Sequence, residues 1–570
     1  MAVCVPPGHS VVPVTSVDVP DGFLGADELE ARFPYGTSDV TKSLAVGVLG
    51  RTIPSPQHVT DLIQQGANPN IKPQLRKKGS KVDGFGYSLL TLAVHDKADN
   101  TFSAIHARQD DDDDDDDDEG DECRVVLPQW PSDELQAAIM KALIDGGADV
   151  NATYRDAASR PIWVTIRCGN EAAFKLLMAQ GGIDLESIFL MALPPSLHPI
   201  LPQYQEVQLS MFRHLITREP TLATERANGG NLVHHAAGYA WGHHSQSFID
   251  TYLDLITANG ADMTADDGGL GETPLHYAAV YGSPYVADYL CRKLPADQIN
   301  RRDGVGETPL SKAAEMLDHR TQQLQLPDTP EVTRERWRAK IDDFKLAIRT
   351  LLRAGADITT IPTIPTIPTA TEKDRRQRQL VLTEYPTVLN ELPTAVMSAV
   401  NAALAPHRSL AALLTPRLAV GPQEAAIFGW RIASYLFDMD AAKEAIGEAI
   451  GVRHTDMARR VCAAAEHFVR SAVYQASSNR EVVGGTADVG GQVVRVPQLQ
   501  CFVVGGVGGR KMELREVVQR AIVDEAAKWG LTGEIDNGFS KNVAAVVWGA
   551  VGWVERGRDG RETFRSLQLT

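Results

Sequence analysis

Two short phrases recur along this chain, and their recurrence constrains its fold more than any other feature. The first phrase reads GETPLHYAAVYG at 271–282, GETPLSKAAEM at 306–316 and, more loosely, GNLVHHAAGYAWG at 230–242. The second phrase occurs as QGANPN, GGADVN, NGADMT and AGADIT, beginning at residues 65, 146, 259 and 354. Self-similarity at a regular period indicates a repeat architecture in which each unit buries its apolar face against its neighbours.

The first phrase predicts a short helix with a defined start and end. Thr273 can accept hydrogen bonds from the first backbone N–H groups, and Pro274 follows where its missing N–H costs nothing. Ala278 and Ala279 are small enough to let a neighbouring helix approach, and Gly282 ends the helix. A second helix over 286–293 then presents one apolar face.

The second phrase predicts the end of a helix followed by an extended turn. In Gly260-Ala261-Asp262, the glycine suits a left-handed residue after a helix, and the aspartate favours the turn that follows. Helix, turn, helix and projecting finger therefore make one unit.

These two phrases together resemble the ankyrin repeat, whose unit is about 33 residues. The resemblance covers roughly residues 37–360. It divides that range into about seven units, at 37–72, 84–152, 156–186, 187–226, 227–267, 268–302 and 303–360. Two units carry insertions, at 96–132 and 317–340, and 331–355 reads as one long outer helix. The predicted fold class is mainly α: an ankyrin-repeat solenoid followed by an α-rich domain with a small β-sheet.

The resemblance implies a protein-binding scaffold without an inherited catalytic centre. In that family the finger tips and the inner-helix face carry the contacts. The matching positions here are Tyr239, Trp241, Glu272, Val280, Tyr281, Glu307, Glu315 and Met316. An aromatic patch of Tyr239, Trp241 and Tyr281, flanked by acids, would bind a partner with a basic rim. The alternative is that these rings pack on adjacent inner helices or on the C-terminal domain.

Four histidines lie close together at 234, 235, 243 and 244. Converging histidines can bind zinc. The resemblance instead places His234 and His276 at the family's usual histidine position, where the imidazole bonds along the repeat, and His243 and His244 fall in a loop. We therefore expect no metal and no cofactor.

The chain's net charge of −17 is concentrated in one place. Ten consecutive acids, Asp110 to Glu119, are followed by Asp121 and Glu122. Such a run predicts a solvated loop, with binding of a basic tail or divalent cations as the alternative. The acidic balance argues against nucleic acid as a partner.

No apolar run is long enough to span a membrane, because Val543–Val554 has only twelve residues. Six scattered cysteines predict reduced thiols inside the cell, and we favour the cytoplasm over the nucleus. The sequence does not indicate an oligomeric state.

Outside the repeats, residues 1–36 read as an irregular segment and 361–382 as a linker. The linker combines a Pro-rich IPTIPTIPT at 361–369 with the basic EKDRRQRQ at 372–379. Basic stretches of this kind can be nuclear import signals, but we favour a solvated helix start.

Residues 383–570 resemble no family known to us. Helices are predicted over 422–438, 439–450, 456–476, 513–529 and 540–555, and two or three strands over 481–504.

One feature of this C-terminal domain could bind phosphate. A predicted strand runs into Gly505, Gly506, Gly508, Gly509, Arg510 and Lys511, and a helix is expected from about Met512. Strand, Gly-rich turn and helix N-terminus can cradle an anion. The spacing departs from the known phosphate motifs, so a plain turn is favoured. An enzyme or nucleotide-binding protein that uses this turn, with the repeats as its targeting module, is the alternative to the scaffold. We predict no catalytic residue.

Overall fold

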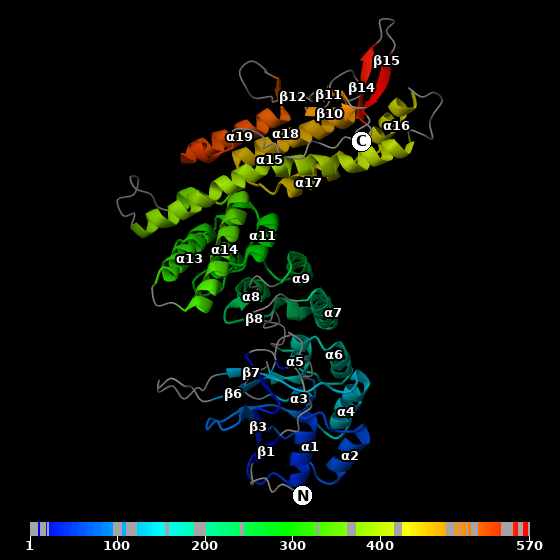
Figure 1. The fold of residues 1–570 in the computed structure, drawn as a ribbon, viewed down its shortest axis with the longest axis vertical. Coiled ribbons are helices and arrows are strands. Elements are labelled where there is room, and N and C mark those ends of the chain that lie inside the picture. Colours follow the sequence, from blue (N-terminus) through cyan, green and yellow to red (C-terminus); the bar gives the residue numbers. More distant parts are fainter. Residues whose placement is uncertain are drawn as a thin grey trace. The chain divides into compact units, whose positions relative to one another are not determined.

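The computed structural model describes part of the chain. The described residues are 9–11, 19, 22–94, 105–109, 122–153, 159–186, 201–239, 244–326, 330–361, 372–414, 424–474, 485–489, 492–496, 500–502, 511–536, 551–556 and 562–567. They belong to two compact units, Met1–Pro274 and Leu275–Thr570. Each unit is described by itself (Figure 1).

Helices of the first unit come in pairs that stack in two layers. They are α1 (Asp39–Leu49), α2 (Pro56–Gln64), α3 (Leu89–Val94), α4 (Asp133–Asp145), α5 (Pro161–Cys168), α6 (Glu171–Met178), α7 (Pro202–Arg218), α8 (Leu232–Tyr239) and α9 (Gln246–Ala258). One layer packs α1 on α3 and α3 on α5, and the other packs α2 on α4 and α4 on α6. This stacking is the arrangement that the recurring phrases predict.

The glycine of the second phrase is left-handed in all four copies. Gly66, Gly147, Gly260 and Gly355 have φ of 95°, 90°, 105° and 87°. In each copy the next residue, an alanine, donates its N–H to the carbonyl five residues back, at 2.9–3.0 Å. A side chain at such φ is strained, so the glycine lets the chain leave the helix in the Schellman manner.

The asparagine that ends two copies of the second phrase links one finger to the next. Asn70 donates its amide to Gly147 O (2.8 Å) and accepts from the N–H of Asp149 (2.7 Å). Asn151 does the same with Gly182 and Asp184, at 2.7 and 2.9 Å. Because each amide satisfies two backbone groups of the following unit, neighbouring repeats are held in register.

A seven-stranded sheet flanks the first repeats, and the sequence analysis did not predict it. Its strands are β1 (His9–Val11), β2 (Phe23–Gly25), β3 (Leu29–Arg32), β4 (Gln74–Lys77), β5 (Phe85–Gly86), β6 (His106–Arg108) and β7 (Glu122–Val126). The order is β1-β3-β4-β6-β7-β2, with β5 on β4.

This sheet adds strands to two segments for which none was predicted. Residues 1–36 contain three short strands: β1 pairs with β3 inside this segment, and β2 and β3 pair with β7 and β4. The insertion 96–132 supplies β6 and β7, an antiparallel pair that flanks the acidic run. Leu29, Leu75 and Val125 are fully buried, so the sheet has an apolar core. Residues 110–121, which hold most of the acidic run, lie outside the described residues. A smaller hairpin, β8 (Arg226–Ala227) with β9 (Gly230–Asn231), precedes α8.

The second unit begins with repeat helices and continues into a helical bundle. The repeat helices are α10 (Pro274–Tyr281), α11 (Pro284–Lys293), α12 (Ala296–Ile299), α13 (Pro309–Leu324) and α14 (Glu331–Arg353). The bundle contains α15 (Glu372–Leu414), α16 (Glu424–Tyr435), α17 (Met439–Ile450), α18 (Asp456–Tyr474) and α19 (Leu514–Trp529). The long outer helix predicted over 331–355 is confirmed as α14. None of the helices in the described ranges is long and apolar enough to cross a membrane.

Helix α15 packs on both the repeats and the bundle. It contacts α13 and α14 on the repeat side, and α16, α17, α18 and α19 on the other. The basic stretch 372–379 is therefore the start of a helix, as predicted, but it is not part of a free linker as the range 361–382 implied. Residues 362–371, which contain most of the IPT motif, lie outside the described residues. The domain boundary predicted near residue 383 stays a prediction.

Short strand pairs complete the second unit. They are β10 (Gly485–Val489) with β11 (Gln492–Val496), β12 (Gln500–Phe502) with β13 (Lys511–Glu513), and β14 (Val551–Arg556) with β15 (Glu562–Leu567). The helix predicted over 540–555 is wrong from Val551 onward, because VGWVER is strand β14. Valine and tryptophan favour a paired strand, and the partner β15 lies close by in sequence.

Candidate functional site

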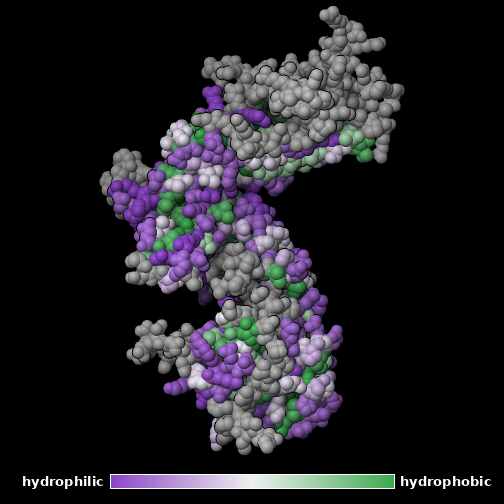
Figure 2. Space-filling view, viewed as in Figure 1, coloured by the Kyte–Doolittle hydropathy of each residue, from purple (hydrophilic) through white to green (hydrophobic). Residues whose placement is uncertain are grey.

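The predicted partner surface of the second unit lies on two inner helices. We define the inner-helix surface as Tyr277, Val280 and Tyr281 of α10 with Lys312, Glu315 and Met316 of α13. These triplets occupy equivalent positions 35 residues apart in two successive repeats. Tyr281 is exposed (41 %), and the other five side chains are half-buried. The rings of Tyr277 and Tyr281 lie 5.8 Å apart and tilted. Figure 2 shows mainly hydrophilic residues over α13 and α14, with smaller hydrophobic groups among them.

The finger turn before α13 presents an apolar tip on a rigid base. Val305 is 64 % exposed. The Oδ1 atom of buried Asp303 accepts from the N–H groups of Val305 (3.0 Å) and Glu307 (2.8 Å). Burial opposes ionisation of Asp303, but these bonds and the Lys312 ammonium together lower the pKa of its carboxyl. The Lys312 ammonium lies 3.1 Å from Asp303 Oδ2 and 3.0 Å from Glu307 Oε2. The turn is therefore fixed from both sides.

The equivalent tip in the first unit has the same chemistry. Leu270 is 55 % exposed, and Asp267 Oδ1 accepts from the N–H groups of Gly269, Gly271 and Glu272. The sequence analysis missed both tips, Leu270 and Val305. Their signal was an apolar residue directly before the Gly-Glu of each phrase.

Other predicted contact residues have different outcomes. Glu272 is buried, so its carboxylate does not present an exposed acid. Trp241 and the side chain of Tyr239 lie outside the described residues, and the three-ring patch stays a prediction. Glu315 is paired with Lys373 of α15.

The histidines of the phrase bond along the repeats, as the family resemblance implied. His234 Nε2 donates to Glu272 O and His276 Nε2 donates to Glu307 O, both at 3.2 Å. Burial of His234 lowers its pKa to about 4, although the bond to Glu272 works in the other direction. His244 is buried, with its ring stacked on Phe248 at 4.9 Å.

We expect the buried, neutral imidazole of His234 to make the first unit less stable in acid. The unfolded chain binds a proton near the ordinary histidine pKa of 6.5, whereas folded His234 does so only near 4. Stability is therefore complete above about pH 6.5 and falls as the pH drops, by about 3 kcal/mol at pH 4. Urea unfolding of wild type and His234→Gln between pH 7 and 4 measures this. Burial also lowers the pKa of His106 to about 4, but His106 is present in both proteins, so its loss of stability at low pH is the same in each. Parallel pH profiles of the two would contradict the assignment.

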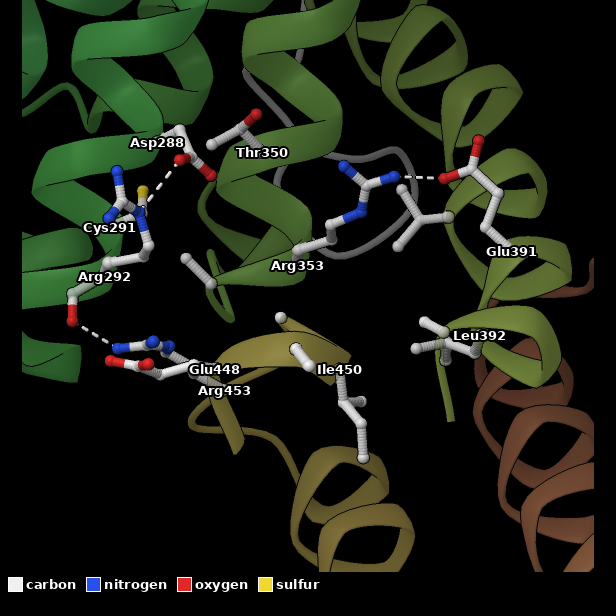
Figure 3. Close-up of a pocket in the computed structure, with 15 residues that line it drawn as sticks. Asp288, Cys291, Arg292, Thr350, Arg353, Glu391, Leu392, Glu448, Ile450 and Arg453 are labelled. Carbon is white, nitrogen blue, oxygen red and sulfur yellow. Dashed lines mark hydrogen bonds and ion pairs between the residues drawn. The ribbon is translucent and has the colours of Figure 1, made fainter. Parts of the chain in front are cut away.

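A pocket lies where the repeats meet the helical bundle within the second unit. It encloses about 280 Å³ between α11, α14, α15, the end of α17 and the segment that follows α17. In Figure 3, Arg292 pairs with Asp288 one turn earlier on α11, and Arg353 of α14 reaches Glu391 of α15. Arg453 donates its backbone N–H to Arg353 O (2.8 Å) and its guanidinium to Arg292 O. These carbonyls belong to the C-terminal turns of α14 and α11, so one arginine satisfies end groups of two repeat helices.

The pocket holds no activated nucleophile. Cys291 lines it, but burial raises the pKa of the thiol well above its ordinary value. A neutral thiol neither attacks a substrate readily nor binds metal as a thiolate. No group of three or more His, Cys, Asp or Glu side chains in the described ranges could hold a metal ion.

In the structure, a strand lies between the predicted phosphate-binding turn and the helix that follows it. Lys511 lies in strand β13, which pairs with β12, and α19 begins only at Leu514. The expected helix is present as α19, but it begins after β13, so its N-terminus does not directly follow the Gly-rich turn. Residues 503–510, with Gly505, Gly506, Gly508, Gly509 and Arg510, lie outside the described residues.

Comparison with known proteins decides the nature of the repeats. The family model of the ankyrin repeat matches residues 270–304. Residues 270–304 of the chain are an ankyrin repeat. Among solved structures, it is similar to the ankyrin repeat domain of Bcl-3, a member of the IkappaB protein family. That match has 16% sequence identity and a TM-score of 0.27, and covers 48% of this chain and 93% of that one. A likeness at this level carries no argument about function. No curated protein matches the chain.

The match at 270–304 contains α10, α11 and α12 together with the tip residue Leu270. The predicted fold class, ankyrin repeats followed by an α-rich region with small β-sheets, is confirmed. Ankyrin repeats are generally protein–protein interaction modules.

Proposed function

We propose that this protein is an interaction scaffold that binds a partner protein through the inner-helix surface and the finger tip of its last two ankyrin repeats. The observation that carries the proposal is the exposure of Tyr281 on the inner helix α10 and of Val305 at the finger tip before α13. Tyrosine supplies a large contact area with few rotamers to immobilise, and it is enriched where binding energy concentrates.

Charge around these residues favours a partner with basic groups. Glu307 and Glu315 belong to this surface, and each already contacts a lysine of the chain itself, Lys312 and Lys373. A carboxylate that accepts an ammonium within the chain can accept one from a partner. The apolar tip and the exposed ring would supply affinity, and the carboxylates would orient the partner.

Affinity capture followed by mass spectrometry tests this function. We expect Tyr281→Ala to reduce recovery of the specific partner about tenfold or more, because truncating a binding anchor costs about 2 kcal/mol. Tyr435→Ala is the matched control, since Tyr435 is more exposed (89 %) but lies in α16, outside the repeats. Equal recovery by wild type and a folded Tyr281→Ala variant would remove the inner-helix surface from the account.

A further inference from the structure

The start of α15 lies against the acidic side of α13. Lys373 pairs with Glu315. The guanidinium of Arg376 faces both oxygens of Asp318, with Nε–Oδ1 and Nη2–Oδ2 at 3.3 Å each. The two acids are three residues apart on α13, and the two bases are three residues apart on α15. One turn of each helix therefore matches the other, charge for charge.

Burial along α15 separates this first turn from the rest of the helix. The side chains of Lys373 and Arg376 are 52 % and 45 % exposed. From Gln377 onward the helix is anchored, since Gln377 and Val381 are buried and Arg349 pairs with Glu384 at 2.6 Å. The Lys373–Glu315 pair is the more exposed of the two and contributes little stability, so the cost of detaching residues 372–376 lies mainly at Asp318.

Asp318 differs from Glu315 in a way that sets what can replace α15. The side chain of Asp318 is only 8 % exposed, whereas that of Glu315 is 33 % exposed. A buried carboxylate left without a cation is costly. Any segment that displaces Arg376 must therefore supply a cation to Asp318. An arginine guanidinium, which can bond both carboxylate oxygens, fits better than a lysine ammonium.

We infer that residues 372–376 are an internal ligand of α13, and that a partner helix carrying Lys and Arg three residues apart replaces them on Glu315 and Asp318. The inference rests on the proposed function, because it names the chemistry of the partner at one edge of the inner-helix surface. It makes α15 a competitor: the partner binds after the first turn of α15 has detached. The anchored part of α15 stays in place throughout.

The test uses the full chain and a fluorescent alanine-rich helical peptide with Lys and Arg three residues apart. We expect the variant Lys373→Ala/Arg376→Ala to bind this peptide at least tenfold more tightly than wild type. Arg375→Ala is the matched control, because Arg375 is on the same turn but pairs with Glu372 of its own helix, 2.8 Å away. Adding Glu315→Gln and Asp318→Asn to the Lys373→Ala/Arg376→Ala variant should abolish peptide binding.

A measurement on the wild-type protein tests the inference even if the Lys373→Ala/Arg376→Ala variant does not fold. At saturating peptide, hydrogen exchange of amides 376–377 should become at least fivefold faster, while amides 381–392 keep their rates. Unchanged exchange at 376–377, or equal peptide affinity of wild type and a folded Lys373→Ala/Arg376→Ala variant, overturns the inference. Tyr281→Ala should leave peptide affinity unchanged, so failure of this inference is distinguishable from failure of the proposed function.

Discussion

Replacing Leu392 by alanine is expected to lower the free energy of unfolding of the second unit by about 3 kcal/mol, the middle of the range for buried leucines. Leu392 is 2 % exposed and lines the pocket between α15 and the end of α14. The same packing face of α15 includes Val388, which is 1 % exposed. The loss should therefore appear on both sides of this contact.

Native-state hydrogen exchange measures the effect where it should occur. Amides of α14 and of the middle of α15 should lose protection together, because both helices share this packing. Leu413→Ala is the control, since Leu413 is in the same helix but 51 % exposed and should change stability by less than about 0.5 kcal/mol. A loss confined to α15, with α14 unaffected, would mean that the repeats do not depend on this helix.

The second large effect is expected at Gly355, which leaves α14 with φ of 87°. A Cβ there would lie 2.7 Å from Arg453 O, a backbone atom that cannot move without displacing the segment 451–455. Gly355→Ala combines the cost of a left-handed residue with this overlap, and we expect a loss of about 3 kcal/mol.

Gly147→Ala separates the two causes. Gly147 has φ of 90° at the same position of an earlier repeat, and a Cβ there would have nothing within 4 Å. We expect it to cost only about 1 kcal/mol. Unfolding of both variants in urea gives the comparison. Equal losses would show that the contact between Gly355 and Arg453 does not matter to stability.

The repeats could be predicted because their determinants are local. A left-handed glycine at the end of a helix and a Thr-Pro helix start are each set by backbone needs within a few residues. The structure places them as those needs require, with Gly66, Gly147, Gly260 and Gly355 as examples. The histidine bonds along the repeats followed from the family resemblance.

The sheet of the first unit could not be predicted in this way. Its strands are two to five residues long, too short to show an alternating pattern, and several of their pairings join distant segments. Leu29, for example, lies opposite Lys77, so its strand is defined by tertiary contact rather than by its own sequence.

The role of α15 was hidden for a related reason. The basic stretch at 372–379 correctly indicated a helix start, but Lys373 and Arg376 find their carboxylates 58 residues earlier in the chain. Charge in one sequence segment does not indicate which surface will neutralise it. The exposed tip Val305 has a local signal, an apolar residue directly before the Gly-Glu of the phrase, but that signal does not by itself indicate a contact.

Site-specific photo-crosslinking tests the central claim most directly. A photo-reactive phenylalanine analogue is placed at Tyr281 in one protein and at Tyr435 in another, and both are irradiated with the captured partner bound. The account predicts a covalent adduct with the partner from position 281 and none from position 435. Adducts from position 435 alone would contradict it, because the partner would then bind the helical bundle rather than the ankyrin repeats.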